Sequence, residues 1–384
     1  MRRFSRRSML KLMGVTAAGY ALGVGPRLRA APGRAQQVAA PRVVHMHVPD
    51  ATNWDFHTGS FVDHISQDAV SEMVDRGLAH LTGTGSRREA WRALIPDLAE
   101  GDRIAIKVNF NNYIDGAEDG AINAVIEPVN ALIAGLLERG FAPAHITVYD
   151  TTRAWHDGGI PARFIDGCRY PDVRFEAYLD NAGPFSPTAR VHFNTPNPAH
   201  AVEDLPLSSA LAGARYLINM PIVKSHPFTG VTLGFKNHFG SIAHCDELHP
   251  YTPGYDYYNL YDPGYSPLVD LNASPYIRDK TILIVGDCLF GNWADPISRP
   301  QPWMTFGYRA PNSLFFGRDP LAIECVMTDL LAAETELLPQ TDDFLRLAAR
   351  AGLDVYERSN PWRPGYQHIA YTRVGLSDNL PGGD

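Results

Sequence analysis

The sequence holds few cysteines, and no two of them are close together. Its 384 residues include only Cys168, Cys245, Cys288 and Cys325, and no C-x-x-C spacing occurs. Iron–sulfur modules and zinc ribbons bind their metal through closely spaced cysteines, so we expect neither here. In an oxidising compartment four cysteines allow three complete disulfide pairings, and buried free thiols are the alternative.

A long apolar run is also missing. The stretch 12–25 is rich in Gly and Ala and is too short and too weakly apolar for a stable membrane span. It follows the adjacent arginines Arg6 and Arg7, in an arrangement that matches the twin-arginine export signature. We therefore expect residues 1–40 to be a twin-arginine signal peptide with its cleavage region, and a disordered basic tail is the alternative. Export would make the twin-arginine translocase a transient partner and the mature chain periplasmic or extracellular.

Beyond this leader the chain lacks an excess of positive charge. Eight of its 34 Lys and Arg residues lie in residues 1–40, which leaves 26 basic against 42 acidic residues, a net charge near −16. Such a surface disfavours nucleic acid and anionic membranes as partners. A hydrophobic content of 45%, with 17 Phe and 17 Tyr, is typical of a folded protein. We expect residues 41–384 to form a single domain whose partner is a small molecule.

The order in which strands and helices alternate along the sequence predicts an α/β fold. A strand at 103–110, a helix at 122–139 and a strand at 145–150 form a βαβ unit with a parallel pair. Further buried strands are expected at 216–223 and 280–287. We therefore predict a mostly parallel sheet with helices on both faces, either in one body or in two lobes.

The stretch 219–240 places basic residues directly after a buried strand. Lysines held among apolar groups become nucleophiles or bases, or they stay charged and hold a phosphate or carboxylate. A helix is expected over 229–237, with small residues on one face. We assign catalytic roles to His226, Lys236 and Lys224. A solvated lysine and an ordinary loop histidine are the alternatives.

Polar side chains also occur where the other strands end. In open α/β sheets, ligands bind outside the carboxyl ends of the strands. Helix caps and solvated charges are the alternative roles for these positions. The residues predicted to bind substrate or cofactor are Lys107, Asn109, Asp150, Arg153, Asn237 and Asp287.

A second group of residues could bind a metal ion. His244, Cys245 and His249 lie close together in sequence and could converge from a loop. The spacing of the two histidines does not stack them on one face of a regular helix. A loop with six tyrosines, 251–265, follows and could line a pocket.

The central stretch resembles the DUF362 family, a domain of unknown function. Its signature is matched by Lys224-x-His226, by Gly230-Val231-Thr232 and by Lys236-Asn237-x-x-Gly240. The resemblance covers roughly residues 100–335 and extends to Lys107-x-Asn109 and to the strand that ends in Asp287. It also includes the motif 319–324, where Glu324 stands in place of the usual aspartate. Many members carry a cysteine-rich ferredoxin segment that this chain lacks.

A more distant resemblance is to the nickel-pincer lactate racemases. The spacing of His226, Gly230 and Lys236 is similar to their His…Gly…Lys segment, and the stretch 150–153 resembles their Asp-x-Thr-Arg motif. The resemblance implies that Lys236 anchors a nickel-type cofactor, that His226 is a general acid or base, and that Arg153 holds an anion. The paired glycines of those enzymes are absent here.

These observations lead to two alternative functions. The first is an exported enzyme that acts on a small anionic or polar substrate through lysine and histidine chemistry, with a bound metal or cofactor left open. The second is a non-catalytic periplasmic protein that captures a small ligand on the same basic surface.

Overall fold

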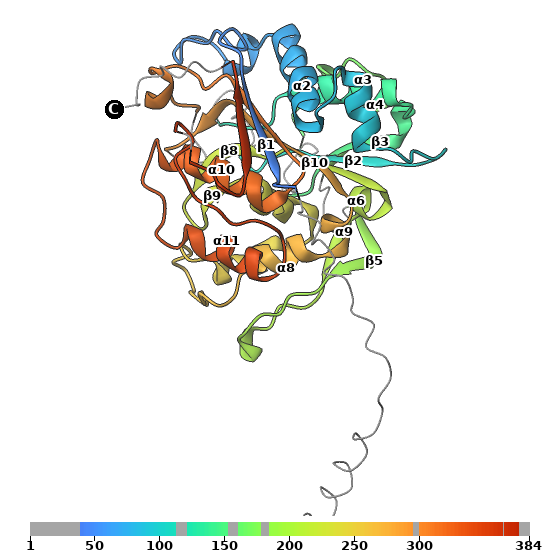
Figure 1. The fold of residues 1–384 in the computed structure, drawn as a ribbon. Helices are drawn as coiled ribbons and strands as arrows, with labels where there is room; N and C mark the ends of the chain where they lie inside the picture. Colours follow the sequence, from blue (N-terminus) through green and yellow to red (C-terminus); the bar gives the residue numbers. More distant parts are fainter. Residues whose placement is uncertain are drawn as a thin grey trace, which may run out of the picture. The chain divides into compact units, whose positions relative to one another are not determined.

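One large sheet carries the structure. The computed structural model describes residues 39–112, 121–152, 160–177, 184–294, 299–363 and 365–375. Within them, ten strands form a sheet in the order β12-β1-β11-β10-β7-β2-β3-β4, with β8 paired to β10 and β9 paired to β8 (Figure 1). The strands are β1 Arg42–His47, β2 Ile104–Lys107, β3 Ile146–Asp150, β4 Arg174–Ala177, β7 Tyr216–Asn219, β8 Ile222–His226, β9 Gly230–Thr232, β10 Thr281–Asn292, β11 Ser313–Gly317 and β12 Ala370–Val374.

The sheet is mostly parallel, as predicted. β2 pairs in parallel with both β3 and β7, β3 with β4, and β10 with both β7 and β8. β1 and β10 run antiparallel to β11, which lies between them, and β9 runs antiparallel to β8. The predicted strand–helix–strand unit is β2, α4 and β3, in which Ile104 pairs with Ile146. A separate pair of strands, β5 Phe185–Val191 and β6 Leu205–Ser208, forms a small antiparallel sheet.

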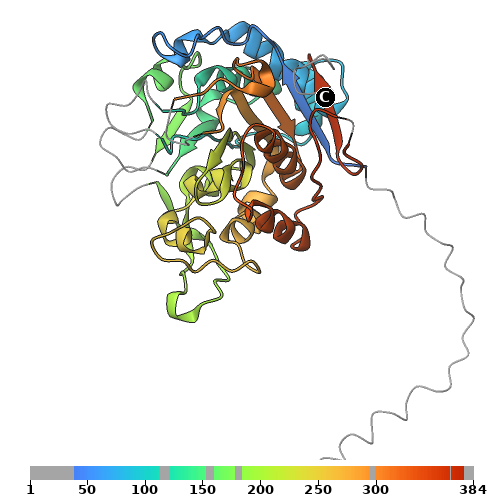
Figure 2. The same cartoon turned by 90° about the vertical axis from the view of Figure 1, so that its left-hand side faces the viewer.

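Helices cover both faces of the large sheet, which confirms the predicted α/β class (Figures 1 and 2). One face carries α2, α3 and α4, and the other carries α7, α8, α10 and α11. The α-helices are α2 Gln67–Thr82, α3 Arg87–Leu94, α4 Ile126–Arg139, α5 Ala162–Asp166, α6 Ser209–Gly213, α7 Gly234–Asn237, α8 Pro267–Ala273, α9 Pro275–Arg278, α10 Pro320–Ala332 and α11 Thr341–Arg350. The short 3-10 helices are η1 Phe61–His64, η2 Pro143–His145, η3 Pro198–His200, η4 His238–Ser241, η5 Cys245–Tyr251 and η6 Met304–Phe306.

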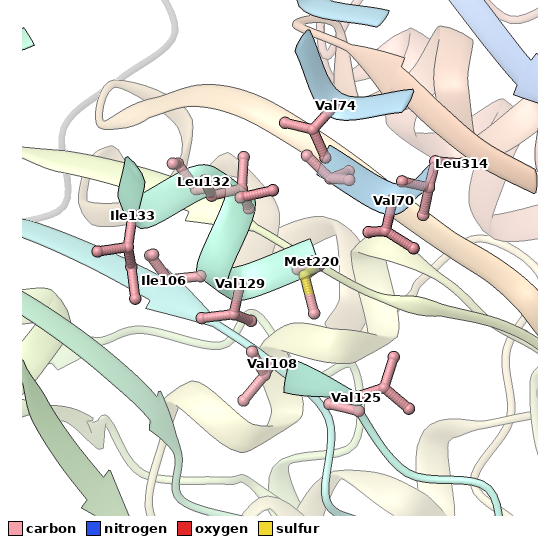
Figure 3. Packing of buried hydrophobic residues seen from close by; sticks show 14 of the residues in the cluster. Val70, Val74, Ile106, Val108, Val125, Val129, Leu132, Ile133, Met220 and Leu314 are labelled. Atoms are coloured by element: carbon pink, nitrogen blue, oxygen red, sulfur yellow. The ribbon is translucent and has the colours of Figure 1, made fainter. Parts of the chain in front are cut away.

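Alternation along the strands divides the apolar side chains between two cores. On the α2 and α4 face, Ile106 and Met220 pack with Val70, Val129 and Leu132, as Figure 3 shows. On the opposite face a second core surrounds α10. Because successive side chains of a strand point to opposite faces, the same strands supply both cores. Whether a polar side chain of a strand faces the α2 and α4 core or the core around α10 therefore depends on its position in this alternation.

The central stretch departs from the prediction in two places. The predicted strand 216–223 is interrupted at Pro221, which has no N–H to donate, and continues as β8. Pro221 O instead accepts a hydrogen bond from Asp287 N at 2.8 Å. The predicted helix over 229–237 is wrong. Its first half forms β9, paired with β8, and only α7 is helical.

None of the helices in the described part of the chain is long and apolar enough to cross a membrane.

Candidate functional site

Buried lysines mark the region of interest. The sequence contains five lysines. Lys107 and Lys224 are fully buried, and Lys236 is only 7% exposed. Lysine almost never loses its solvent unless its charge is paired, because desolvation of an ammonium group is costly. Each of the three lysines therefore requires its own physical explanation.

Lys107 is stabilised by a carboxylate from the neighbouring strand. Its Nζ lies 3.3 Å from Asp150 Oδ1 and donates to Val108 O at 2.5 Å and to Asn237 Oδ1 at 3.2 Å. The other oxygen of Asp150 accepts from Phe110 N at 2.6 Å. Burial lowers the pKa of Lys107, and the Asp150 carboxylate opposes this effect. The pair joins the carboxyl ends of β2 and β3.

Asn237 connects this ion pair to the rest of the sheet. Its Oδ1 accepts from Asn109 Nδ2 at 3.2 Å as well as from Lys107, and its Nδ2 donates to Asn219 Oδ1 at 2.7 Å. Asn219 in turn donates to Gly234 O at 2.9 Å. The side chain of Asn237 thus forms hydrogen bonds through both its oxygen and its nitrogen. Its main effect is to fix α7 against the ends of β2 and β7.

Two glycines of the central motif allow this close packing. A Cβ on Gly240 would lie 2.1 Å from Asp150 Oδ1 and 2.8 Å from Lys107 Nζ. Gly230 has φ +80°, and a Cβ there would lie 1.8 Å from Thr341 Oγ1. Both positions therefore require glycine because other parts of the protein approach them, which needs no ligand.

A cavity lies beside α7 at the carboxyl ends of the strands. Its volume is about 250 Å³, and it combines aromatic rings with amide, imidazole, thiol, hydroxyl and amine groups. The lining residues are Asn109, Asn111, Asn112, Thr152, His226, Pro227, Phe228, Thr232, Lys236, Asn237, Phe239, Gly240, Cys245 and His249.

Lys236 is the cationic side chain among these lining residues. Its Nζ lies 3.9 Å from the centre of the Phe239 ring and 3.4 Å from His249 Nε2. Burial lowers the pKa of Lys236 to about 8. None of the lining residues carries a carboxylate, so the described cavity wall offers this amine no opposite charge. A fraction of the amine is therefore unprotonated near neutral pH.

Two imidazoles flank the amine. Burial and the Lys236 charge hold the pKa of His249 at about 3, so its neutral ring accepts the hydrogen bond from Lys236. Burial, Lys236 and Lys224 also lower the pKa of His226. His226 Nδ1 accepts from Phe228 N at 3.0 Å, so the neutral ring carries its proton on Nε2. His226 is thereby set as a neutral proton donor or acceptor.

The predicted metal-binding trio does not gather at the cavity. Cys245 and His249 line it, but His244 is exposed and has a left-handed backbone with φ 52°. Burial raises the pKa of the Cys245 thiol to about 11. In the part of the chain that the structure describes, no three His, Cys, Asp or Glu side chains are grouped so that they could hold a metal ion.

Two of the remaining predicted residues do not line the cavity. Lys224 is fully buried in β8 and does not line it. Asp287 is buried in β10 and shares the face of Leu283, Val285 and Leu289, which belong to the α2 and α4 core. Burial raises the pKa of Asp287 to about 6. Arg153 lies outside the described residues.

Sequence reasoning gave no site role to several cavity residues, among them Thr232, or to Glu324. Thr232 lines the cavity at 3% exposure, and its Oγ1 has no hydrogen-bond partner among the described residues. Glu324 of α10 is fully buried, and both of its carboxylate oxygens lie 3.3 Å from Phe235 N at the start of α7. Burial raises the pKa of Glu324 to about 8. In the sequence, only its position in the motif 319–324 pointed to Glu324.

Solved structures offer two partial likenesses. A Thermotoga maritima protein of known crystal structure is 15% identical, with a TM-score of 0.29, over 46% of this chain and 39% of its own. The lactate racemase apoprotein from Thermoanaerobacterium thermosaccharolyticum is 12% identical, with a TM-score of 0.40, over 70% of this chain and 56% of its own. This chain therefore spans less than two thirds of either protein. The comparison with curated proteins gave no match.

The family comparison is more extensive. The family described as a domain of unknown function, DUF362, matches residues 104–329, which is more than half of the chain. The matched region begins in β2 and ends in α10, and it contains the three buried lysines and Glu324. The chain belongs to the DUF362 family.

Proposed function

We propose that the chain is an exported enzyme that acts on a small anionic or polar substrate in the cavity beside α7. Lys236 is its nucleophile or base, and His226 transfers protons. The observation that carries the proposal is the buried amine of Lys236 in a cavity whose described lining residues include no carboxylate. An amine in such a place attracts anions when charged and reacts with electrophiles when neutral.

The other buried lysines have supporting roles in this proposal. Lys107 is neutralised by Asp150 and holds α7 in place. Lys224 adds positive charge near His226 and disfavours its protonated form. Lys236 is thus the lysine that meets the substrate. His226 can exchange a proton with it through Nε2.

A covalently held cofactor is compatible with these residues, whereas the described residues offer no group of ligands for a free metal ion. The sequence resemblance to nickel-pincer enzymes implies such a group, with Lys236 as its anchor. The Cys245 thiol and the His249 imidazole are soft donors beside that anchor. Because the described residues supply no grouped metal ligands, a metal would have to arrive within the cofactor. When bound, the group would accept electrons from the reacting carbon, while His226 would move the proton.

The test uses the mature protein with a panel of small anions in deuterated water. Acetate, lactate, pyruvate and phosphate are added singly, and binding is read from thermal stability while chemistry is read from deuterium incorporation by NMR. We expect an anion to raise the melting temperature and at least one to exchange a C–H proton. Lys236→Met should lose the exchange. Lys280→Met should keep it, because Lys280 donates to Leu211 O and Ala212 O away from the cavity.

The outcome separates an enzyme from a binding protein. If an anion stabilises the protein and Lys236→Met weakens only that effect, with no exchange or turnover in either protein, the non-catalytic alternative replaces the enzyme. If no anion binds, the site proposal itself is wrong.

A further inference from the structure

We infer that the cavity takes a small anionic carbonyl compound of the 2-oxo acid class and that Lys236 forms an imine with its carbonyl carbon. The inference rests on the proposed function, since it uses the same cavity, and it names the substrate class and the covalent step.

The shape and lining of the cavity set the size and charge of this ligand. A volume of about 250 Å³ corresponds to roughly eight water volumes, which suits a molecule of on the order of ten non-hydrogen atoms. Among the described lining residues there is no carboxylate, and Lys236 is one of them. The charge of Lys224 also acts on the lining residue His226 and lowers its pKa. An anion therefore gains from entering, whereas a cation is repelled.

Donor groups match the oxygens of a 2-oxo acid. Thr232 Oγ1 is buried in the cavity wall and has no hydrogen-bond partner among the described residues, and such a buried hydroxyl is costly unless a ligand bonds to it. His226 presents its protonated Nε2, since Nδ1 is occupied by Phe228 N. One donor can serve the carboxylate and the other the carbonyl oxygen. Thr232, which the sequence showed only as part of a motif, is thereby assigned a binding role.

The surroundings of Lys236 favour attack on a carbonyl. Its Nζ contacts the Phe239 ring and the neutral His249, and the described cavity wall has no opposite charge that would hold it protonated. With its pKa at about 8, the amine has on the order of a hundredfold more unprotonated form near pH 7 than an ordinary lysine. The proton that the attacking amine loses can pass to the former carbonyl oxygen, because a His249 ring with a pKa of about 3 is too weak a base to hold it.

The covalent step conserves atoms and electrons. The Nζ lone pair forms a bond to the carbonyl carbon, and the carbonyl π pair moves to oxygen, which takes a proton. The nitrogen loses a proton, and the C–O bond then breaks with a second proton transfer, so that water leaves and C=N forms. One amine and one carbonyl give one imine and one water, with no oxidant or reductant.

The experiment traps the imine in the mature protein. Pyruvate is incubated with the protein, sodium borohydride reduces C=N to a secondary amine, and intact and peptide masses locate the adduct. We expect the reduced adduct on the buried Lys236 and not on Lys280, which is only partly buried. Lys236→Met should show no adduct, and Lys280→Met should match the parent protein.

A second variant keeps the test decisive if Lys236→Met folds poorly. Thr232→Val removes the unpaired hydroxyl while nearly keeping the side-chain shape, so its stability should not fall. We expect it to trap several-fold less pyruvate at equal borohydride. An unchanged yield in Thr232→Val would remove Thr232 from the binding site.

The remaining outcomes would each contradict the inference. They also show whether the proposed function fails together with it. If pyruvate and lactate stabilise the protein equally and no adduct forms, the site binds anions without an imine. If Lys236 of natively exported protein already carries another group, the cofactor role replaces the imine. If neither anion stabilises the protein and no adduct forms, both proposals fail.

Discussion

At the scale of single residues, similar side chains have different surroundings because their partners differ. Lys107 is paired with Asp150, whereas the described cavity wall offers Lys236 no carboxylate. Burial alone therefore does not distinguish these two lysines. The described partners do, because without a carboxylate the desolvation cost of Lys236 is uncompensated and its pKa falls.

Glu324 yields a prediction about pH and stability. Its folded-state pKa of about 8 lies above the ordinary glutamate pKa of about 4.3, so the folded protein binds its proton more tightly. The free energy of unfolding should therefore fall as pH rises between these values, by up to about 1.4 kcal/mol per pH unit for this group. Glu324→Gln, which resembles the protonated form, should lose that contribution.

Urea unfolding of both proteins at pH 5 and pH 8 measures this effect. We expect the variant to gain stability relative to the parent protein as pH rises. Asp287 and Glu127, whose pKa values burial raises to about 6 and about 7, contribute equally to both proteins. Parallel pH profiles would show that Glu324 is ionised in the folded state.

At the scale of elements, the position of α7 determines the site. This helix has only four residues, so its own hydrogen bonds cannot hold it. Asn219 and Asn237 hold it from the strand side, and Glu324 holds its start from α10. Lys236 is placed by these external contacts.

Gly240 tests how tightly this arrangement is packed. Gly240→Ala would force a Cβ against Asp150 and Lys107, so we expect a loss of about 1–3 kcal/mol in the free energy of unfolding. Gly213→Ala is the matched control, because a Cβ at Gly213 meets nothing within 4 Å. Chemical denaturation of the two variants gives the comparison. Equal stability of both would mean that the ion pair can shift without cost.

At the scale of the whole molecule, charge separates the leader from the rest of the chain. The paired arginines lie in a segment without acids, and the remainder is strongly acidic. We propose that this segment directs export of the folded protein. The acidic net charge of the remainder does not oppose the proposed binding of small anions in the cavity, because surface charge is screened by salt.

Export can be tested at the paired arginines. Arg6→Lys with Arg7→Lys keeps the charge but removes both guanidinium groups, which differ from ammonium in geometry and donor number. We expect the variant to accumulate inside the cell uncleaved, whereas the parent chain is found in the exported fraction. Cell fractionation with immunodetection measures this. Equal export of both chains would exclude the twin-arginine route.

The sequence alone determined the fold class, the strand–helix–strand unit and the family. Helical spacing predicted a helix over 122–139, where α4 spans Ile126–Arg139, and the strands expected at 103–110 and 145–150 are β2 and β3. These features are local, so they can be read from neighbouring residues. The motif of the central stretch could also be recognised from its residue types and their spacing.

Only the tertiary structure decided which members of that pattern share the cavity. Lys224 lies within β8 and Asp287 within β10, which continues to Asn292, and neither lines the cavity, whereas Thr232 and Cys245 do. The break at Pro221 and the strand β9 redirect the chain after β7. A side chain's partners depend on contacts between residues far apart in sequence. The pairing of Lys107 with Asp150, and the lack of such a partner for Lys236 in the described cavity wall, could therefore not be read from spacing.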